Sequence, residues 1–110
     1  MRNVEARSIS SDADGRHYEI LSDGRQLLLV RICPEDDDHD PWLCTLELPN
    51  GELSLEGRGD DPLVAFADAR LWWEEVESRH PMPWERIHEA LDGVGAFHDP
   101  DDRWSQVVDG

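Results

Sequence analysis

The sequence predicts an α+β fold, in which a four-stranded antiparallel sheet of two hairpins is followed by two helices packed on one face. Two observations predict it. In the first half of the chain, alternating apolar and polar residues surround two turn dipeptides, and in the second half apolar residues recur at helical spacing. The chain of 110 residues is long enough for one hydrophobic core. We therefore expect a single domain over 1–110 with the element order ββββαα.

The first predicted hairpin follows a polar segment. Residues 1–15 are polar, and we expect a loose N-terminal arm that adds at most a short edge strand. Two segments rich in β-branched, aromatic and aliphatic residues then flank Asp23-Gly24, a dipeptide that favours the positive φ angles of a type I′ turn. Pairing around this turn sets Ile20 opposite Leu27.

The second predicted hairpin has the clearest alternation in the chain. Asn50-Gly51 supplies the turn, and pairing around it sets Leu48 opposite Leu53 and Leu46 opposite Leu55. These leucines share one face, and the polar residues between them share the other. The hairpin is therefore expected to have one dry face and one wet face.

The first helix follows the sheet, which we expect to end at Gly57 and Gly59. Asp60 or Asp61, followed by Pro62, forms a good helix start. At about 100° per residue, one apolar sector forms the predicted core face, namely Ala65, Phe66, Ala69, Trp72, Trp73 and Val76. A weaker apolar stripe either meets the next helix or stays open for a partner, namely Leu63, Val64, Ala67 and Leu71.

The second helix is expected to begin near Pro83, because the prolines within 80–83 break the first one. Gly93 and Gly95 are candidate C-terminal caps. Residues 96–110 form an acidic tail that we expect to dock at least through Trp104. The predicted buried stripe of this helix consists of Trp84, Ile87, Leu91 and Val94.

The charge of the chain is its outstanding feature. Twenty-six acidic residues against ten basic ones give a formal net charge of -16, and every basic residue is arginine. Such a charge repels nucleic acid and anionic lipid and attracts basic protein surfaces. The apolar runs are too short to cross a membrane, and no signal peptide is recognisable at the N-terminus. We expect a cytoplasmic protein that binds neither nucleic acid nor membrane directly.

The loop 34–41, which is bounded by prolines and carries its acids at 35–40, has the spacing of a calcium loop but not its backbone. Asp36, Asp38 and Asp40 alternate as calcium ligands would, yet Pro41 occupies the sixth position, where the turn requires glycine. No histidine stands at ligand spacing from another histidine or a cysteine. We therefore expect no metal and no cofactor.

The two cysteines, Cys33 and Cys44, are mirror positions across this loop, and they could be cross-strand neighbours. We interpret them as small buried apolar side chains, and a disulfide would require an oxidising compartment. The chain has no phosphate-binding loop and no nucleophile elbow. We therefore do not expect an enzyme.

The acidic residues gather in clusters, two of them close to a tryptophan, and we predict a partner-binding surface there. Rows of carboxylates can imitate a phosphate backbone, and exposed aromatic residues ringed by polar groups are typical interface anchors. In size, charge and α+β build, the chain resembles anti-CRISPR proteins and immunity proteins against nuclease toxins. That resemblance implies a bacterial or phage inhibitor whose partner is a nuclease or CRISPR effector. The predicted residues are Glu35, Asp36, Asp37, Asp38, Asp40, Trp42, Asp60, Asp61, Glu74, Glu75, Asp99, Asp101, Asp102 and Trp104.

Two other interpretations remain open. A salt-adapted organism or a high-GC genome also produces an acidic chain without lysine, and the domain would then have an ordinary function. A protein that needs molar salt to fold would favour salt adaptation. The other alternative is a small enzyme or ligand-binding module with a pocket between sheet and helices.

Five short motifs follow one another within residues 18–76, namely Asp23-Gly24-Arg25, Val30-Arg31-Ile32-Cys33-Pro34, Trp42-x-Cys44, Gly59-x-Asp61-Pro62-Leu63 and Ala65-Phe66-Ala67. Their layout resembles that of a family of short bacterial domains of unknown function. The chain departs from the family pattern at Cys33, where glycine is expected. Because the family has no assigned activity, the resemblance implies the order of strands and helices and nothing about function.

Overall fold

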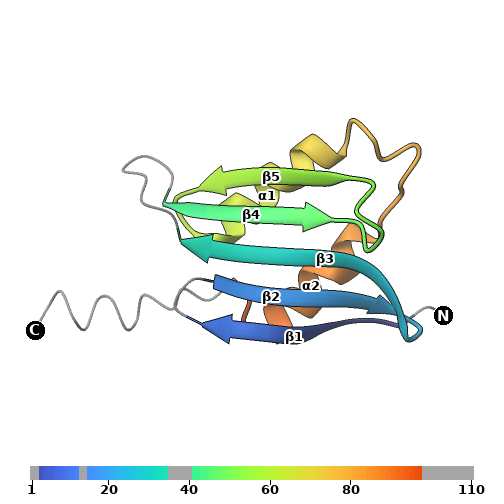
Figure 1. Cartoon of the computed structure of the whole chain (residues 1–110), viewed down its shortest axis with the longest axis horizontal. Helices are drawn as coiled ribbons and strands as arrows, with labels where there is room; N and C mark the ends of the chain where they lie inside the picture. Colours follow the sequence, from blue (N-terminus) through green and yellow to red (C-terminus); the bar gives the residue numbers. More distant parts are fainter. Residues whose placement is uncertain (1–2, 13–14, 35–40, 98–110) are drawn as a thin grey trace, which may run out of the picture.

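The computed structural model describes residues 3–12, 15–34 and 41–97 of the chain (Figure 1). Five strands form one antiparallel sheet in the order in which they occur along the chain, and two helices follow. The α+β class, the antiparallel sheet and the two helices are confirmed. The elements are β1 (Val4–Asp12), β2 (Gly15–Ser22), β3 (Arg25–Pro34), β4 (Trp42–Glu47), β5 (Ser54–Gly59), α1 (Pro62–Trp73) and α2 (Trp84–Gly93).

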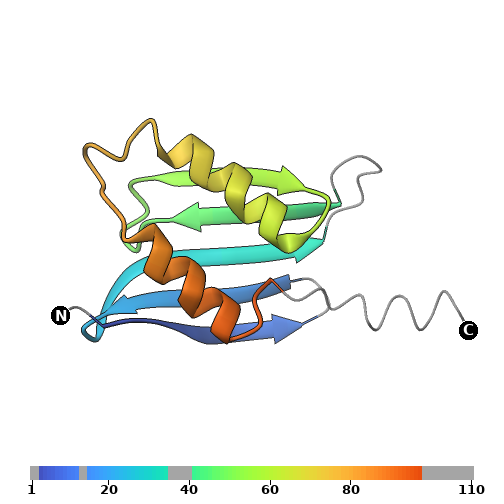
Figure 2. The same cartoon turned by 180° about the vertical axis from the view of Figure 1, so that it is seen from behind.

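Both helices cover the same face of the sheet (Figure 2). Helix α1 packs on β4 and β5, and helix α2 packs on β1. The apolar core lies between the sheet and these helices. Within the described part of the chain, the opposite face of the sheet carries no helix (Figure 1).

The predicted number of strands is wrong, because the N-terminal segment supplies a fifth strand. Strand β1 is nine residues long and pairs with β2 along the edge of the sheet. Val4 and Ala6 pack against the core, whereas Arg7, on the other face, forms an ion pair with Glu19 of β2. An edge strand needs apolar residues on only one of its faces, and in β1 two small residues, Val4 and Ala6, cover that face. The sequence signal of β1 is weak for that reason.

The first hairpin has the predicted turn but a different register. Asp23 and Gly24 both have positive φ, 53° and 83°, as a type I′ turn requires. Ile20, however, pairs with Leu28, because Leu27 is an extra residue at a β-bulge. The predicted pairing of Ile20 with Leu27 is therefore wrong by one residue.

The second hairpin confirms the predicted pairing, since Leu46 lies opposite Leu55 and the Leu48 N–H donates to the Leu53 carbonyl over 3.0 Å. The sheet ends at the second of the two expected glycines, since β5 continues through Gly57 and ends at Gly59. Absence of a side chain at these two positions lets α1 approach the strand closely. A Cβ atom on Gly59 would lie 2.4 Å from a methyl carbon of Val64.

Helix α1 begins as predicted, with Asp61 as the N-cap and proline at the first helical position. The Asp61 carboxylate accepts a hydrogen bond of 2.9 Å from the Val64 N–H. Ala65, Phe66, Ala69 and Trp73 are buried. Trp72 is 53 % exposed, so its assignment to the core face is wrong. The buried sector is centred near Ala69, which leaves Trp72 at its margin.

Helix α2 buries Trp84, Ile87 and Leu91 as predicted, but Val94 is 44 % exposed. The helix has already ended at this position. Gly95, with φ of 76°, donates its N–H to the Asp92 carbonyl, and the Ala96 N–H donates to the Leu91 carbonyl over 2.9 Å. This is a Schellman ending, and buried Ala96 takes the place in the core that the helical spacing assigned to Val94.

Candidate functional site

The structure describes only part of the predicted partner-binding surface. Trp42, Asp60, Asp61, Glu74 and Glu75 belong to the described residues. The remaining predicted residues lie outside them, namely Glu35, Asp36, Asp37, Asp38, Asp40, Asp99, Asp101, Asp102 and Trp104.

Trp42 is a core residue and not an exposed anchor. Its side chain is only 4 % exposed. The alternation of β4 places Trp42 on the same face as Cys44 and Leu46, which is the face that the helices cover. Trp42 is therefore not the exposed aromatic anchor that the sequence predicted.

The four described acids flank α1. Asp60 and Asp61 precede the helix and Glu74 and Glu75 follow it, and all four are exposed. A helix of 12 residues is about 18 Å long. The two acidic pairs therefore stand at the two ends of one helix and do not form a single cluster.

Between these acids, the side of α1 that faces away from the sheet is apolar. The helical spacing of the second apolar stripe places it roughly opposite the buried sector that contains Ala69. The second helix does not cover this stripe, which was one of the two outcomes that the sequence left open. Its large side chains are exposed, and Leu71 is 60 % exposed. We call this surface the outer face of α1, and it consists of Leu63, Val64, Ala67 and Leu71, with Trp72 on its flank.

Trp72 is the binding candidate that sequence reasoning missed. It is a large exposed aromatic residue only two and three positions from Glu74 and Glu75, which is the environment that we predicted for Trp42. Its angular position at the margin of the core sector was the available signal. The sequence offers two adjacent tryptophans, Trp72 and Trp73, and only one of them can point to the centre of the core.

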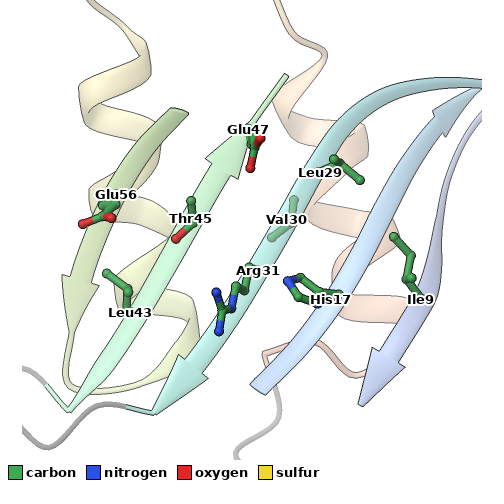
Figure 3. Close-up of a pocket in the computed structure, with 9 residues that line it drawn as sticks. All are labelled: Ile9, His17, Leu29, Val30, Arg31, Leu43, Thr45, Glu47 and Glu56. Carbon is green, nitrogen blue, oxygen red and sulfur yellow. The ribbon is translucent and has the colours of Figure 1, made fainter. Parts of the chain in front are cut away.

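A second candidate site is a hollow on the face of the sheet that the helices leave open (Figure 3). Its volume is about 440 Å³, which is within the range of small-molecule sites. This hollow does not lie between sheet and helices, where the ligand-binding interpretation of the sequence expected a pocket. The residues that line it are Ile9, His17, Leu29, Val30, Arg31, Leu43, Thr45, Glu47 and Glu56.

One row of polar side chains crosses this open face from edge to edge. The strand register aligns Ser10, His17, Arg31, Thr45 and Glu56, one residue from each of the five strands. The Ser10 hydroxyl and the Nδ1 atom of His17 are hydrogen-bonded over 3.1 Å. The sequence could not reveal this row, because it depends on the bulges that set the register.

The residues that line the hollow carry opposite charges on its two sides. Arg31 and His17 lie on β3 and β2, whereas Glu47 and Glu56 lie on β4 and β5 (Figure 3). Among the described residues, the structure gives Arg31 no ion pair within 4.0 Å. The arrangement could hold a group that carries both charges.

The cysteines offer no reactive site in the structure. Cys33 lies opposite Leu43 and Cys44 lies opposite Ile32, so the two cysteines are not cross-strand neighbours; both are buried, and neither forms a disulfide. Burial raises the pKa of the Cys44 thiol far above its ordinary value of 9.0. Raising the pKa keeps the thiol protonated and unreactive.

The described residues contain no group of three or more His, Cys, Asp or Glu side chains that could hold a metal ion. Of the helices that the structure describes, none has the length and apolar character to cross a membrane. Comparisons of the chain with family models, curated proteins and solved structures find no match. The resemblances noted in the sequence therefore stay predictions.

Proposed function

We propose that this protein is a non-enzymatic inhibitor that binds a basic, nucleic-acid-binding surface of another protein and blocks it. The single observation that carries the proposal is the outer face of α1, where an exposed apolar stripe lies between two pairs of acids. The partner would be a nuclease or a CRISPR effector, whose groove for nucleic acid is basic.

The outer face of α1 has the composition of a protein interface. Interfaces combine a central apolar and aromatic patch with a polar rim, and tryptophan is among their most frequent hot spots. Leu71 and Trp72 supply the patch, and Asp60, Glu74 and Glu75 supply the rim. A partner that fits must offer an apolar contact together with lysine or arginine on both sides of it.

Two acidic segments lie outside the described residues, and the described residues that precede them are at the end of the sheet where α1 begins. The loop 35–40 leaves the sheet at Pro34, which pairs with Trp42, and Trp42 in turn pairs with Gly59 just before the helix. The C-terminal segment follows Gly95, whose carbonyl accepts a hydrogen bond of 2.9 Å from Arg16.

Arg16 pairs with Ile32 near that same end of the sheet. The points from which both acidic segments start therefore share one end of the sheet with Asp60 and Asp61. This attachment favours joint use of the acids and the outer face of α1 in one surface.

The net charge of -16 gives the interaction a long-range component. Such a charge accelerates encounter with a basic partner. Salt screens this attraction at separations beyond the Debye length, which is about 10 Å at 0.1 M. A partner that binds through this surface should therefore be released progressively as salt is added.

The test is capture of host proteins by the whole chain of 110 residues at low and high salt, with variants that separate the contributions of the apolar patch and the acidic rim. Leu71→Asp combined with Trp72→Ala removes the apolar patch, and Glu74→Gln combined with Glu75→Gln removes part of the rim. Each should lose a partner that the wild type holds, and the wild type should displace nucleic acid from that partner. Capture of the same proteins by the wild type and both variants would refute the proposal.

The matched control for the rim variant is Glu52→Gln combined with Glu89→Gln. It removes the same charge from exposed sites outside α1. This control should capture the partner as the wild type does. Equal loss with the control and the rim variant would mean that total charge, and not the outer face of α1, determines binding.

A further inference from the structure

The two edges of the sheet differ in what covers their backbone groups. On β5, the Arg58 N–H points away from β4 and donates a hydrogen bond of 2.9 Å to the Asp68 carboxylate of α1. Helix α1 also approaches this strand closely at Gly57 and Gly59. Strand β1 forms the other edge (Figure 1). Within the described chain, no side chain caps the backbone groups of its outer side in this way.

The hydrogen bonding between β1 and β2 determines which backbone groups of β1 point outward. The Asp23 N–H donates to the Asn3 carbonyl over 3.0 Å, so these two residues form a hydrogen-bonded pair of the antiparallel ladder. Such pairs alternate along a ladder, and the register over residues 4–8 is regular. The N–H and C=O groups of Val4, Ala6 and Ser8 therefore point away from β2, and they have no partner within the described chain.

The residues between these positions carry opposite charges. Glu5 and Arg7 stand on either side of Ala6, on the face of the sheet that has no helix, and both are exposed. Arg7 forms an ion pair with Glu19, yet its side chain is 68 % exposed, so further N–H groups of the guanidinium are accessible. Among the described residues, Glu5 has no ion pair within 4.0 Å.

We propose that the β1 edge pairs with the β1 edge of a second copy of this chain, in an antiparallel contact centred on Ala6. A two-fold axis perpendicular to the sheet sets Ala6 opposite Ala6 and Val4 opposite Ser8. The outward groups then form about six hydrogen bonds, two for each pair of residues. Glu5 of each copy lies directly opposite Arg7 of the other, in pairs whose side chains approach closely.

The charges select this register over its neighbours. Outward groups must meet outward groups, so the centre of the contact lies on a residue and not between two residues. A centre at Glu5 would set Glu5 opposite itself, and a centre at Arg7 would set Arg7 opposite itself, and like charges directly opposite are destabilising. With the centre at Ala6, like charges lie only on the diagonals, at about 7–8 Å and not at about 5 Å. The irregularity between Ser8 and Ser10 ends the regular edge, and Ala6 is the middle of what remains.

The helix layer is compatible with this contact. The side chains that the second copy brings under the helices are small, because Val4, Ala6 and Ser8 lie on that face of β1. Helix α2 crosses the sheet obliquely and reaches the middle of β1 with its C-terminal end (Figure 2). Ala6 precedes the middle of the strand. The two-fold axis therefore places the ends of the two α2 helices on opposite sides of the contact.

This dimer does not depend on the proposed inhibitor function and does not compete with it. Helix α1 lies over β4 and β5, on the side of the sheet away from β1. One continuous sheet would therefore carry an accessible outer face of α1 at each of its two ends. Because each copy has a net charge of -16, self-association should strengthen as salt rises to about 0.3 M, whereas binding to a basic partner should weaken.

The test combines sedimentation velocity with amide hydrogen exchange of the whole chain, from about 5 µM to about 500 µM in about 0.3 M salt. The wild type should sediment as a dimer at the highest concentration. Exchange at the Ala6 N–H should slow at least about fivefold once about four fifths of the chain is dimeric, since exchange then proceeds from the remaining monomer. The Glu56 N–H, which points outward on β5 by the same alternation, should exchange at one rate throughout.

Charge reversal tests the register. Glu5→Arg alone sets arginine opposite arginine twice, and Arg7→Glu alone sets glutamate opposite glutamate twice, so each variant should be a monomer. In an equimolar mixture of the two variants, opposite charges face each other again, and dimers should re-form. The control Glu56→Arg makes the same change of charge as Glu5→Arg at an exposed site on β5, and it should remain dimeric.

Several results would overturn the proposal. One is a wild type that is monomeric at the highest concentration, and another is a dimer in which exchange at Ala6 does not slow. Single variants that stay dimeric, or a mixture that stays monomeric, would overturn it as well. Capture of a partner through α1 should be retained by Glu5→Arg in every case, so the two proposals fail separately.

Discussion

Gly57 of β5 and Ala69 of α1 are in close backbone contact. A Cβ atom added to Gly57 would lie 2.1 Å from the Ala69 nitrogen and 2.4 Å from the Ala65 carbonyl oxygen. Helix α1 therefore rests directly on the strand. This contact fixes the height of the helix above the sheet, and it determines which side of α1 is left to solvent.

We expect Gly57→Ala to lower the free energy of unfolding by about 3 kcal/mol or more, because the methyl group must displace backbone atoms. Urea denaturation followed by circular dichroism measures the change. The control is Gly93→Ala, where an added Cβ meets no atom within 4 Å and φ is not positive. Equal stability of Gly57→Ala and the wild type would mean that α1 does not lie this close to β5.

Replacing each of the adjacent tryptophans by alanine should have very different effects on the free energy of unfolding. Trp73 is fully buried, and its indole N–H donates to the His80 carbonyl over 2.8 Å, whereas Trp72 is largely exposed. Trp73→Ala should therefore cost about 3–5 kcal/mol of stability. Trp72→Ala should change stability by about 0.5 kcal/mol or less. Thermal and urea unfolding of both variants test the pair, and similar losses would contradict the orientation of α1.

Asp61 has two roles that conservative variants can separate. Its carboxylate caps α1 by accepting from the Val64 N–H, and it is also one of the acids that we predict to bind a partner. Asp61→Ala should cost about 1 kcal/mol, whereas Asp61→Asn, which keeps a capping oxygen, should cost less. If Asp61 also contacts the partner, Asp61→Asn should weaken binding while stability is nearly retained. Loss of binding only with alanine would indicate a structural role alone.

Stability should fall as the pH rises above about 9. The Cys44 thiol ionises freely in the unfolded chain, but burial raises its pKa in the folded protein. Above the ordinary value of 9.0, the unfolded state therefore loses a proton that the folded state retains, and unfolding becomes more favourable. The chain has no lysine, so few other side chains titrate in this range.

Urea unfolding between pH 8 and pH 10.5 measures this loss, at steps of about half a pH unit. Cys44→Ala should be less stable at neutral pH, because it leaves a cavity, yet its stability should depend less on pH. A slope in Cys44→Ala as steep as that of the wild type would assign the effect to another group.

The sequence predicted the elements whose signals are local. The turn at Asp23-Gly24, the pairing of Leu46 with Leu55 and the cap at Asp61 each depend on a few adjacent residues, and the structure confirms all three. The alternation of the second hairpin also identified its core face. Signals of this kind need no knowledge of the rest of the fold.

What the sequence did not predict depends on distant parts of the chain. Strand β1 is polar on one face, and it is held by pairing with β2 and by packing against α2. The bulge at Leu27 shifts a register that a simple hairpin would continue. The exposure of Trp72 follows from the angle at which α1 rests on Gly57. Each of these features is set by tertiary contact, and together they create the open face and the outer face of α1.

The central claim, that the outer face of α1 binds a basic partner, is tested most directly by the affinity of the captured partner. Isothermal titration of that partner compares the wild type with Leu71→Asp combined with Trp72→Ala, from about 0.05 M to about 0.5 M salt. We predict that the variant binds at least about tenfold more weakly, since the loss of one anchor typically costs 2 kcal/mol or more. We also predict that the affinity of the wild type falls steeply as salt is added. An affinity that neither the variant nor the salt changes would contradict the claim.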